Sequence, residues 1–292
     1  MTTRPIQRAG VGSRASLWVL VLVYAVARVA QAYPHRIPTV AIVALHVLPP
    51  LLFALVHGAL RYGVRGILVF TGLCLAIGNL TENLSILTGF PFGHYHFTDV
   101  MGPKFFQVPV LLGLAYIGIG YLSWTLGLLI AGNVGGRLGG HRTVTVPLIA
   151  AFAMVAWDLS MDPIWSNIVH GWIWHSGGAY FGVPVSNFLG WYFTVYLIYQ
   201  SFALYLRRRP ADVSPLPCRY WQLAVVLYGL CAAGNLLVVA PPAVPVVTDA
   251  SGAAWTVSGI LGASALVSLF VMGPFALIAW VRLMDRKGEP YC

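Results

Sequence analysis

Long runs of apolar residues determine what this chain can fold into. Eight runs stand out, each close to the roughly 20 residues that a helix needs to cross the hydrocarbon core of a bilayer. They cover residues 16–33, 38–60, 66–88, 108–131, 144–161, 187–206, 220–240 and 254–282. Because 59% of the residues are hydrophobic and only 9% are charged, a water-soluble surface is excluded. The sequence therefore predicts an all-α integral membrane protein, a bundle of about eight transmembrane helices.

The basic residues predict how this bundle is oriented. Of the 17 Arg and Lys residues, 14 fall in the N-terminal segment and every second connection after it, 2 (Arg36 and Lys104) fall in the remaining connections, and Arg28 lies inside the first run. Cytoplasmic loops are enriched in such residues, so we expect both termini in the cytoplasm. We expect one multi-pass domain over residues 1–292, with short cytoplasmic tails at 1–15 and 283–292, in a prokaryotic cytoplasmic membrane. The basic residues are interpreted as topology signals and contacts with lipid headgroups, and we expect no nucleic acid as a partner.

Four charged residues lie inside or at the ends of these runs. Glu82, Asp158 and Asp162 are acidic and Arg28 is basic. A charged side chain at the centre of a bilayer costs about 2.5–3.5 kcal/mol even on the most lenient scale, so each marks a candidate functional site. Counting residues along the runs places Glu82, Arg28 and Asp158 in the outer half of the bilayer at similar depth, where these three charges are expected to neutralise one another. A purely structural ion pair of Arg28 with Glu82 or Asp158 is the alternative.

Polar and aromatic residues gather around these acids in the sequence. Asp158 and Asp162 are four residues apart and share a helical face, and Pro163 is expected to end their helix. The connections 89–99, 162–187 and 241–253 are expected to meet at the outer face. Many of their rings belong to the usual interfacial belt, but rings packed around an acid can also stabilise a cation. The residues that we expect to bind substrate are Asn79, Asn83, Phe92, Tyr95, Trp157, Trp165, Trp174, Asn187 and Trp191.

Histidines and cysteines provide little sign of a metal site. The eight histidines are scattered, and no His-Glu-x-x-His motif occurs. We expect no metal, and interpret His94 and His96, together with Arg28, as charge partners or proton relays. No Cys-x-x-Cys motif occurs either, so neither a disulfide nor a cysteine-ligated metal is expected.

Three strings of residues resemble a known family. They are Glu-Asn-Leu-Ser-Ile-Leu-Thr-Gly-Phe-Pro-Phe-Gly-His-Tyr at 82–95, Trp-Asp-Leu-Ser-Met-Asp-Pro at 157–163 and Tyr-Phe-Gly-Val-Pro-Val-Ser-Asn-Phe-Leu-Gly-Trp at 180–191. Together with Val108-Pro109 and the stretch 172–174, they are similar to the carotenoid biosynthesis protein family, which includes bisanhydrobacterioruberin hydratase and carotenoid 1,2-hydratases. The resemblance extends over most of residues 75–200. It implies the addition of water across the terminal double bond of an acyclic ψ end group, without a cofactor.

The buried acids suggest a mechanism for such a reaction. An unactivated alkene must be protonated by an acid that stays neutral until use, and burial favours the neutral form of a carboxyl group. We expect Glu82 or Asp158 to donate the proton, Asp162 to assist, and Trp157, Trp165 and Tyr95 to shield the carbocation. The expected partners are a lipophilic carotenoid or other isoprenoid and membrane lipids, and the sequence does not indicate an oligomeric state.

Three other functions are compatible with the same residues. An acid-initiated carotenoid or isoprenoid cyclase would use the buried acid and the rings but exclude water. A proton-coupled transporter of a lipophilic substrate would also bury charges, and would need a polar path to the cytoplasmic side. A structural or lipid-binding membrane protein would tolerate replacement of the carboxyl groups by amides.

Overall fold

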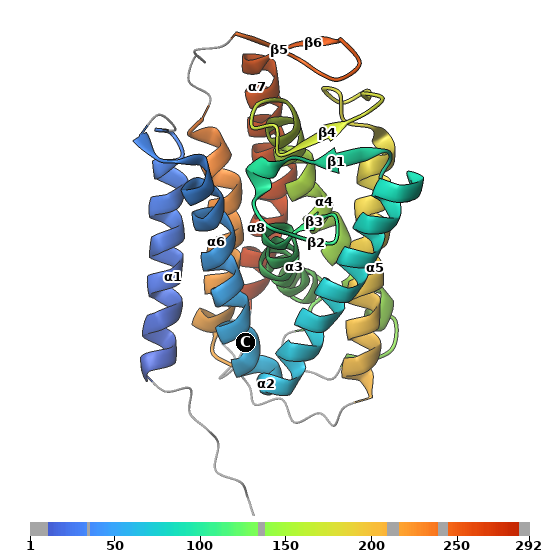
Figure 1. Ribbon diagram of the computed structural model, residues 1–292. Coiled ribbons are helices and arrows are strands. Elements are labelled where there is room, and N and C mark those ends of the chain that lie inside the picture. The colour runs from blue at the N-terminus through green and yellow to red at the C-terminus, as the bar shows by residue number, and fades with distance from the viewer. Residues whose placement is uncertain (1–10, 34–35, 134–137, 209–215, 239–244, 286–292) are drawn as a thin grey trace, which may run out of the picture.

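The fold is described from a computed structural model, which covers residues 11–33, 36–133, 138–208, 216–238 and 245–285. It is a bundle of helices with short β-ribbons at one end (Figure 1). The helices are α1 (Val11–Ala30), α2 (Thr39–Thr88), α3 (Val110–Ile130), α4 (Arg142–Asn167), α5 (Val185–Arg207), α6 (Cys218–Leu236), α7 (Val257–Val267) and α8 (Gly273–Met284). A short 3-10 helix, η2 (Asp99–Met101), follows β1, and a π-helical turn, η3 (Ser268–Met272), joins α7 to α8.

Membrane-spanning length and apolar character are present, as predicted. Within the described ranges, four helical stretches are long and apolar enough to cross a bilayer: Ala41–Thr88, Val110–Ile130, Arg142–Asn167 and Val257–Met284. A shorter apolar stretch covers Ala15–Ala30. The fold class is therefore all-α with membrane character, whereas the count of eight spans and the cytoplasmic position of the termini stay predictions. The predicted tails at 1–15 and 283–292 lie mostly outside the described residues.

Two of the predicted runs, 38–60 and 66–88, belong to the single helix α2, which bends sharply at Gly63. The backbone of Gly63 has φ 70° and ψ 167°, a region that residues with a Cβ rarely enter. In Figure 1 the first arm of α2 descends to this bend and the second arm rises again to the opposite corner. The two arms of α2 thus bring Thr88 back to the end of the molecule from which Thr39 started.

Helix α4 is longer than expected, because Pro163 lies inside it instead of ending it. A proline has no N–H to donate to the carbonyl four residues earlier, here that of Leu159. The hydroxyl of Tyr180 donates to this oxygen at 3.2 Å instead. The helix therefore continues to Asn167 and keeps Asp158 and Asp162 on successive turns within it.

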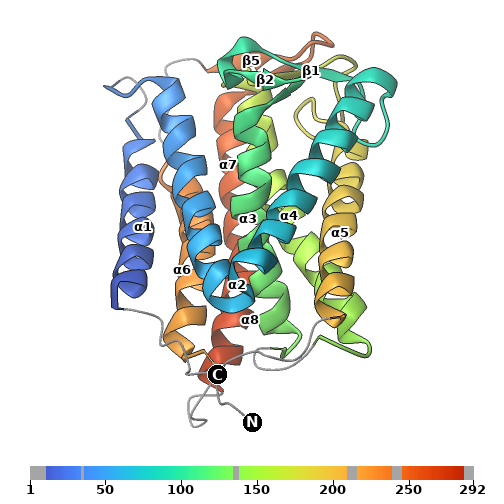
Figure 2. The same ribbon diagram turned by 60° about the horizontal axis from the view of Figure 1, so that its bottom comes forward.

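The central helix of the bundle is α3, and the outermost helices carry apolar side chains on their free faces. Figure 2 shows α3 between α2, α4, α6 and α7, and almost every residue from Ala115 to Leu129 is buried. Exposed apolar residues are frequent on α1, η3 and α8, among them Leu22, Val26, Phe270 and Leu277. Such apolar outer faces are suited to contact with lipid chains.

Short antiparallel ribbons close one end of the bundle. Among the described residues, β1 (Tyr95–Phe97) pairs with β4 (Trp172–Trp174), β2 (Lys104–Phe105) with β3 (Val108–Pro109), and β5 (Val246–Thr248) with β6 (Ala254–Thr256). The connections 89–99 and 162–187 meet there as expected, and the described part of 241–253 joins them (Figure 1). The expectation that the chain has no disulfide is wrong, because Cys218 is disulfide-bonded. Spacing in the sequence does not reveal which cysteines approach in space.

Candidate active site

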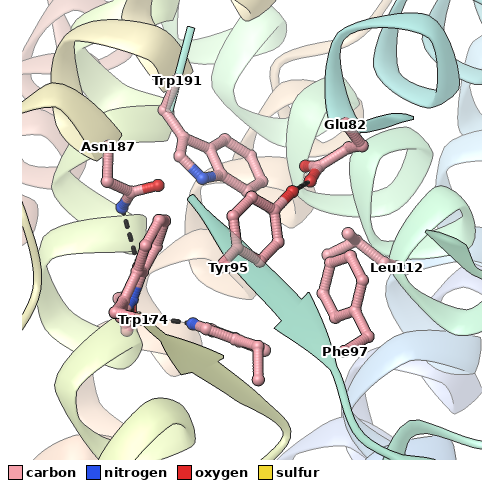
Figure 3. Close-up of a pocket in the computed structure, with 9 residues that line it drawn as sticks. Glu82, Tyr95, Phe97, Leu112, Trp174, Asn187 and Trp191 are labelled. Carbon is pink, nitrogen blue, oxygen red and sulfur yellow. Dashed lines mark hydrogen bonds between the residues drawn. The ribbon is translucent and has the colours of Figure 1, made fainter. Parts of the chain in front are cut away.

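A small cavity lies where the β1–β4 ribbon covers the ends of α2, α4 and α5 (Figure 3). Its volume is about 20 Å³. A single water molecule needs roughly 10–15 Å³ on this measure, together with two to four polar partners. The cavity therefore has room for one water. The residues that line it are Glu82, Tyr95, Phe97, Leu112, Asp162, Trp172, Trp174, Asn187 and Trp191.

Glu82 reaches this cavity from the second arm of α2 and is held by two phenols. Tyr95 donates its hydroxyl hydrogen to Oε2, and Tyr116 donates to Oε1 at 2.7 Å. Tyr95 comes from β1 and Tyr116 from α3, and the Glu82 side chain is 3% exposed. Because a phenol can donate or accept, these partners remain able to bond Glu82 both with and without its proton.

The two side-chain oxygens of Asp162 accept hydrogen bonds from three N–H groups. Its Oδ1 accepts from Trp172 Nε1 at 3.0 Å and from Trp174 Nε1 at 3.2 Å, and its Oδ2 accepts from Asn187 Nδ2 at 2.7 Å. Indole and amide N–H groups have no lone pair with which to bind a carboxylic acid proton. The arrangement is complementary to an ionised Asp162 carboxylate.

Asp158 lies one helical turn away and shares a partner with Asp162. Asn187 Nδ2 also donates to Asp158 Oδ2 at 3.0 Å. The other oxygen, Oδ1, is buried with no hydrogen-bond partner among the described residues. Two ionised carboxylates that share one amide repel each other, so the geometry suits a single proton on this pair.

The β1–β4 ribbon brings the hydrogen-bond donors to both acids. In its register Tyr95 lies opposite Trp174, and Phe97 lies opposite Trp172. Because successive strand residues point to opposite faces, these four rings face the cavity while His96 points outward. A single two-stranded ribbon therefore provides one hydrogen-bond donor to Glu82 and two hydrogen-bond donors to Asp162.

Aromatic rings form most of the remaining wall. Trp191 stacks on Tyr116, with ring centres 4.6 Å apart and planes at 7°. Trp157 and Trp191 form a T-shaped pair with ring centres 6.3 Å apart. Tyr95 and Trp174 have centres 4.7 Å apart. Such π faces attract a positive charge, more strongly where water is excluded.

A second, much larger cavity of about 1070 Å³ adjoins the first, and Leu112 and Trp172 line both. Its lining is mainly apolar and comes from α1, α2, α3, α4, α6, α7 and the connections near their ends. Trp157 and Trp165 belong to its wall. The pair of cavities thus combines space for a long hydrocarbon with a water-sized chamber that contains two acids.

The carotenoid biosynthesis protein family model matches residues 37–251, well over half of the 292 residues. The chain belongs to this family. No curated protein and no solved structure matches it. The resemblance noted in the sequence is therefore confirmed, and the matched range contains both acids, their partners and the β1–β4 ribbon.

The structure of this carotenoid biosynthesis protein brings together most of the predicted site residues. Glu82, Asp162, Tyr95, Trp174, Asn187 and Trp191 line the small cavity, and Trp157, Trp165 and Arg28 line the large one. Phe92 is buried behind the wall, 6.5 Å from Tyr95 and 6.2 Å from Trp191 between ring centres.

Two predicted substrate-binding residues have other partners in the structure. Asn83 Nδ2 donates to the backbone oxygen of Asn79 at 2.8 Å and to its side-chain oxygen at 3.0 Å, and Asn83 Oδ1 accepts from Gln107 N. Neither asparagine lines the two cavities. Their contacts link α2 to the loop before β3.

The predicted charge partners do not reach the acids. Among the described residues no ion pair joins Arg28 to a carboxylate, and its guanidinium bonds Gln31, Asn235 and the backbone of Cys231. The expectation of mutual neutralisation is therefore wrong, because equal depth in a bilayer does not specify direction around a bundle.

The two histidines lie on the outer surface, not beside the carboxyl groups. His94 and His96 are exposed, and His96 Nδ1 lies 2.8 Å from His175 Nε2. Partial burial, the neighbouring His175 and Lys104 together lower the pKa of His96. Strand alternation, which points Tyr95 inward, directs His96 away from Glu82.

Tyr116 and Trp172 are the site residues that sequence reasoning missed. Tyr116 lies within a nearly uniform apolar helix, and Trp172 was noted only as part of the stretch 172–174 that resembles the family, without a role in the site. A signal did exist for Tyr116, since a phenol deep in a membrane helix requires a hydrogen-bond partner. The residue that supplies it, Glu82, is 34 positions away in the chain.

Proposed function

We propose that this protein is a membrane-embedded carotenoid hydratase, which adds water across the terminal C=C bond of an acyclic ψ end group. The observation that carries the proposal is the water-sized chamber that is lined by Glu82, Asp162 and several aromatic rings. Hydration requires an acid, a water and a surface that tolerates a carbocation. The small cavity, with its acids, its aromatic rings and room for one water, lies beside a large apolar cavity and is suited to all three.

The hydrogen bonds support an assignment of roles to the acids. Glu82 lines the chamber and has partners that bind either protonation state, so it is suited to donate a proton and regain it. Asp162 is complementary to the anion, so it can orient the water and stabilise positive charge. Asp158, which shares Asn187, holds the single proton of the aspartate pair and keeps Asp162 ionised.

The reaction is balanced without any other reagent. The Glu82 carboxyl transfers its proton to the less substituted alkene carbon, and the π electron pair forms the new C–H bond. The resulting tertiary cation is captured by the water oxygen, and the oxonium loses a proton to Asp162. That proton returns to Glu82 through water or the substrate hydroxyl, so one molecule of water is added and no electrons are exchanged.

The large cavity suits the rest of a polyene chain. Its apolar wall meets the chamber at Leu112 and Trp172, so an end group that passes between them would place its double bond beside Glu82. This arrangement favours a hydratase over a cyclase, which has no use for a water site. Transport has less support, because the residues of α3 from Ala115 to Leu129 are buried and mainly apolar.

Labelled water tests the proposal. Membranes that produce lycopene and contain the protein are incubated anaerobically in oxygen-18 water, and their pigments are analysed by mass spectrometry. A product heavier than its substrate by one labelled water is expected, absent in Glu82→Gln and strongly reduced in Asp162→Asn. Asp285→Asn, an exposed carboxylate at the other end of the bundle, is the matched control and should behave as wild type.

Two results would count against it. An isomer of unchanged mass that requires Glu82 would establish a cyclase. Unaltered pigment in all samples, with lycopene and with acyclic carotenoids of other chain length, would refute the hydratase and leave transport or lipid binding.

A further inference from the structure

A positive charge lies in the wall of the large cavity, away from the acids. Arg28 is 7% exposed and lines this cavity. Of the five N–H bonds of a guanidinium, three have acceptors: Gln31 Oε1 at 2.9 Å, the Cys231 backbone oxygen at 2.8 Å and Asn235 Oδ1. The Nε–H is buried against Gly234, and neither it nor the second hydrogen of Nη1 has a partner among the described residues. Arg28 therefore has donor capacity that the protein does not use.

None of the acceptors around Arg28 carries a negative charge. They are an amide, a second amide and a backbone carbonyl, and no carboxylate of the described residues lies within 4.0 Å of it. A buried cation without a counter-charge is costly, by several kcal/mol in real proteins. The proposed hydrocarbon substrate offers no compensation, since a polyene has no anionic group.

His46 lies in the same wall and shares the side-chain oxygen of Gln31 with Arg28. Its Nε2 lies 2.6 Å from Gln31 Oε1 and its Nδ1 lies 2.7 Å from the Ile42 backbone oxygen. Both oxygens are acceptors, so a neutral imidazole, which has one ring hydrogen, can donate to only one of them. An anion placed beside Arg28 and His46 would favour a hydrogen on both ring nitrogens.

The orientation of Asn235 is set by an irregular helix. The π-helical turn η3 presents the hydroxyl of Ser268, which accepts from Asn235 Nδ2 at 2.9 Å, and Ser160 accepts from the same nitrogen at 3.2 Å. The amide oxygen is thereby directed to Arg28. Single π-helical turns occur frequently at functional sites, where they re-aim side chains.

The rest of the cavity is suited to hydrocarbon, and its charged end lies near the ends of α1 and α6. Arg28 is two residues from the end of α1, and Asn235 is one residue from the end of α6. We propose that this end of the large cavity binds the oxyanion of an amphiphilic lipid, a phosphate or carboxylate whose chain lies along the apolar lining. A membrane phospholipid or an acidic isoprenoid could supply the same chemistry. The site does not depend on the hydration reaction.

Quenching of tryptophan fluorescence tests this site directly, because Trp157, Trp165 and Trp172 line the cavity. The full-length protein in a nonionic detergent is titrated with dibromostearic acid or its methyl ester, and with dibromoacyl phosphatidylglycerol or the matching diacylglycerol. At least one anionic probe should bind ten times more tightly than its uncharged counterpart. Arg28→Gln should abolish this preference, whereas Arg65→Gln, an exposed arginine near the Gly63 bend, should retain it.

The two anionic probes distinguish the source of the oxyanion. A preference for phosphatidylglycerol identifies a membrane phospholipid, and a preference for the fatty acid identifies a free amphiphilic acid. Equal affinity for charged and uncharged probes, or a charge preference that survives in Arg28→Gln, overturns the proposal.

A second variant keeps the test decisive if Arg28→Gln does not fold. Val43→Phe narrows the apolar part of the cavity and leaves Arg28 in place, so it should weaken binding of all four probes. Unchanged affinities in this variant would place binding elsewhere and overturn the proposal. Because binding is measured without turnover, loss of hydratase activity and loss of this site are separate results.

Discussion

The N–H donors around Asp162 predict how stability and activity change when its carboxylate is replaced by an amide, and when the carboxylate and the amide of Asn187 are exchanged. In Asp162→Asn the new amide oxygen can still accept from the two indoles, but its NH2 then replaces Oδ2. That NH2 faces Asn187 Nδ2, which lies 2.7 Å from Oδ2 and is also held by Asp158. One charge-assisted hydrogen bond becomes a contact between two donors, and its loss is expected to cost about 1.5–3 kcal/mol.

A second substitution should restore the fold without restoring the chemistry. In Asp162→Asn/Asn187→Asp the amide donates from position 162 and the carboxylate accepts at 187, so the stability lost in the single variant should largely return. The anion is then displaced by about one hydrogen-bond length from its original place. Because a misplacement of about 1 Å can cost a hundredfold in rate, hydration should stay at least about a hundredfold below wild type.

Denaturant unfolding in mild detergent, followed by tryptophan fluorescence, measures the stability of all three proteins, and the labelled-water assay measures their rates. Wild-type stability in Asp162→Asn would show that the donors are not directed at an ionised carboxylate. A double variant no more stable than the single one would refute the donor–acceptor argument itself.

Three further predictions concern other parts of the site. Gly190→Ala should destabilise the protein by about 1–3 kcal/mol, because its methyl would lie 2.7 Å from a backbone oxygen of the loop before β1; Gly229→Ala, where nothing lies within 4 Å, should gain about 0.5–1 kcal/mol in the same unfolding assay. Tyr116→Phe removes the hydroxyl that donates to Glu82 but keeps the aromatic ring, so hydration should slow by about tenfold or more. An unchanged rate would contradict the assignment of Glu82 as the proton donor. The pKa of His96 is lower in the folded protein, through partial burial and His175, than the value of about 6.5 in an unfolded chain. The unfolded chain therefore binds the proton better, and the β1–β4 ribbon should lose stability as pH falls through about 6.5. Amide protection factors in the ribbon, which are corrected for the intrinsic slowing of exchange at lower pH, should decrease, and they should decrease less in His96→Gln.

Sequence patterns were sufficient to find the acids, because a carboxyl group in an apolar run stands out against its surroundings. Glu82 and Asp162 were identified in this way, and the neighbouring strings led to Tyr95, Trp174, Asn187 and Trp191. The roles could not be separated, because they depend on which partners can accept a proton. That distinction needs the phenols of Glu82 and the indoles of Asp162 to be seen in contact.

Direction around the bundle was the property that the sequence could not supply. Hydropathy reports how deep Arg28 lies but not which helix it faces, and α1 packs against α2 and α6 rather than against α4. Pro163 shows a second limit. A proline often ends a helix, but Pro163 lies inside α4, where the distant hydroxyl of Tyr180 binds the carbonyl oxygen that the proline leaves free.

The pairing of β1 with β4 has a consequence for how such a site can be altered. Tyr95 on β1 donates a hydrogen bond to Glu82, and Trp172 and Trp174 on β4 donate to Asp162. The pairing register of the two strands fixes the relative position of all three donors. A graft that replaced either loop alone would leave one acid with foreign partners across the ribbon. In chimeras between relatives, residues 89–99 and 170–184 should thus be transferred together, as one exchangeable module assembled from two separate stretches of chain.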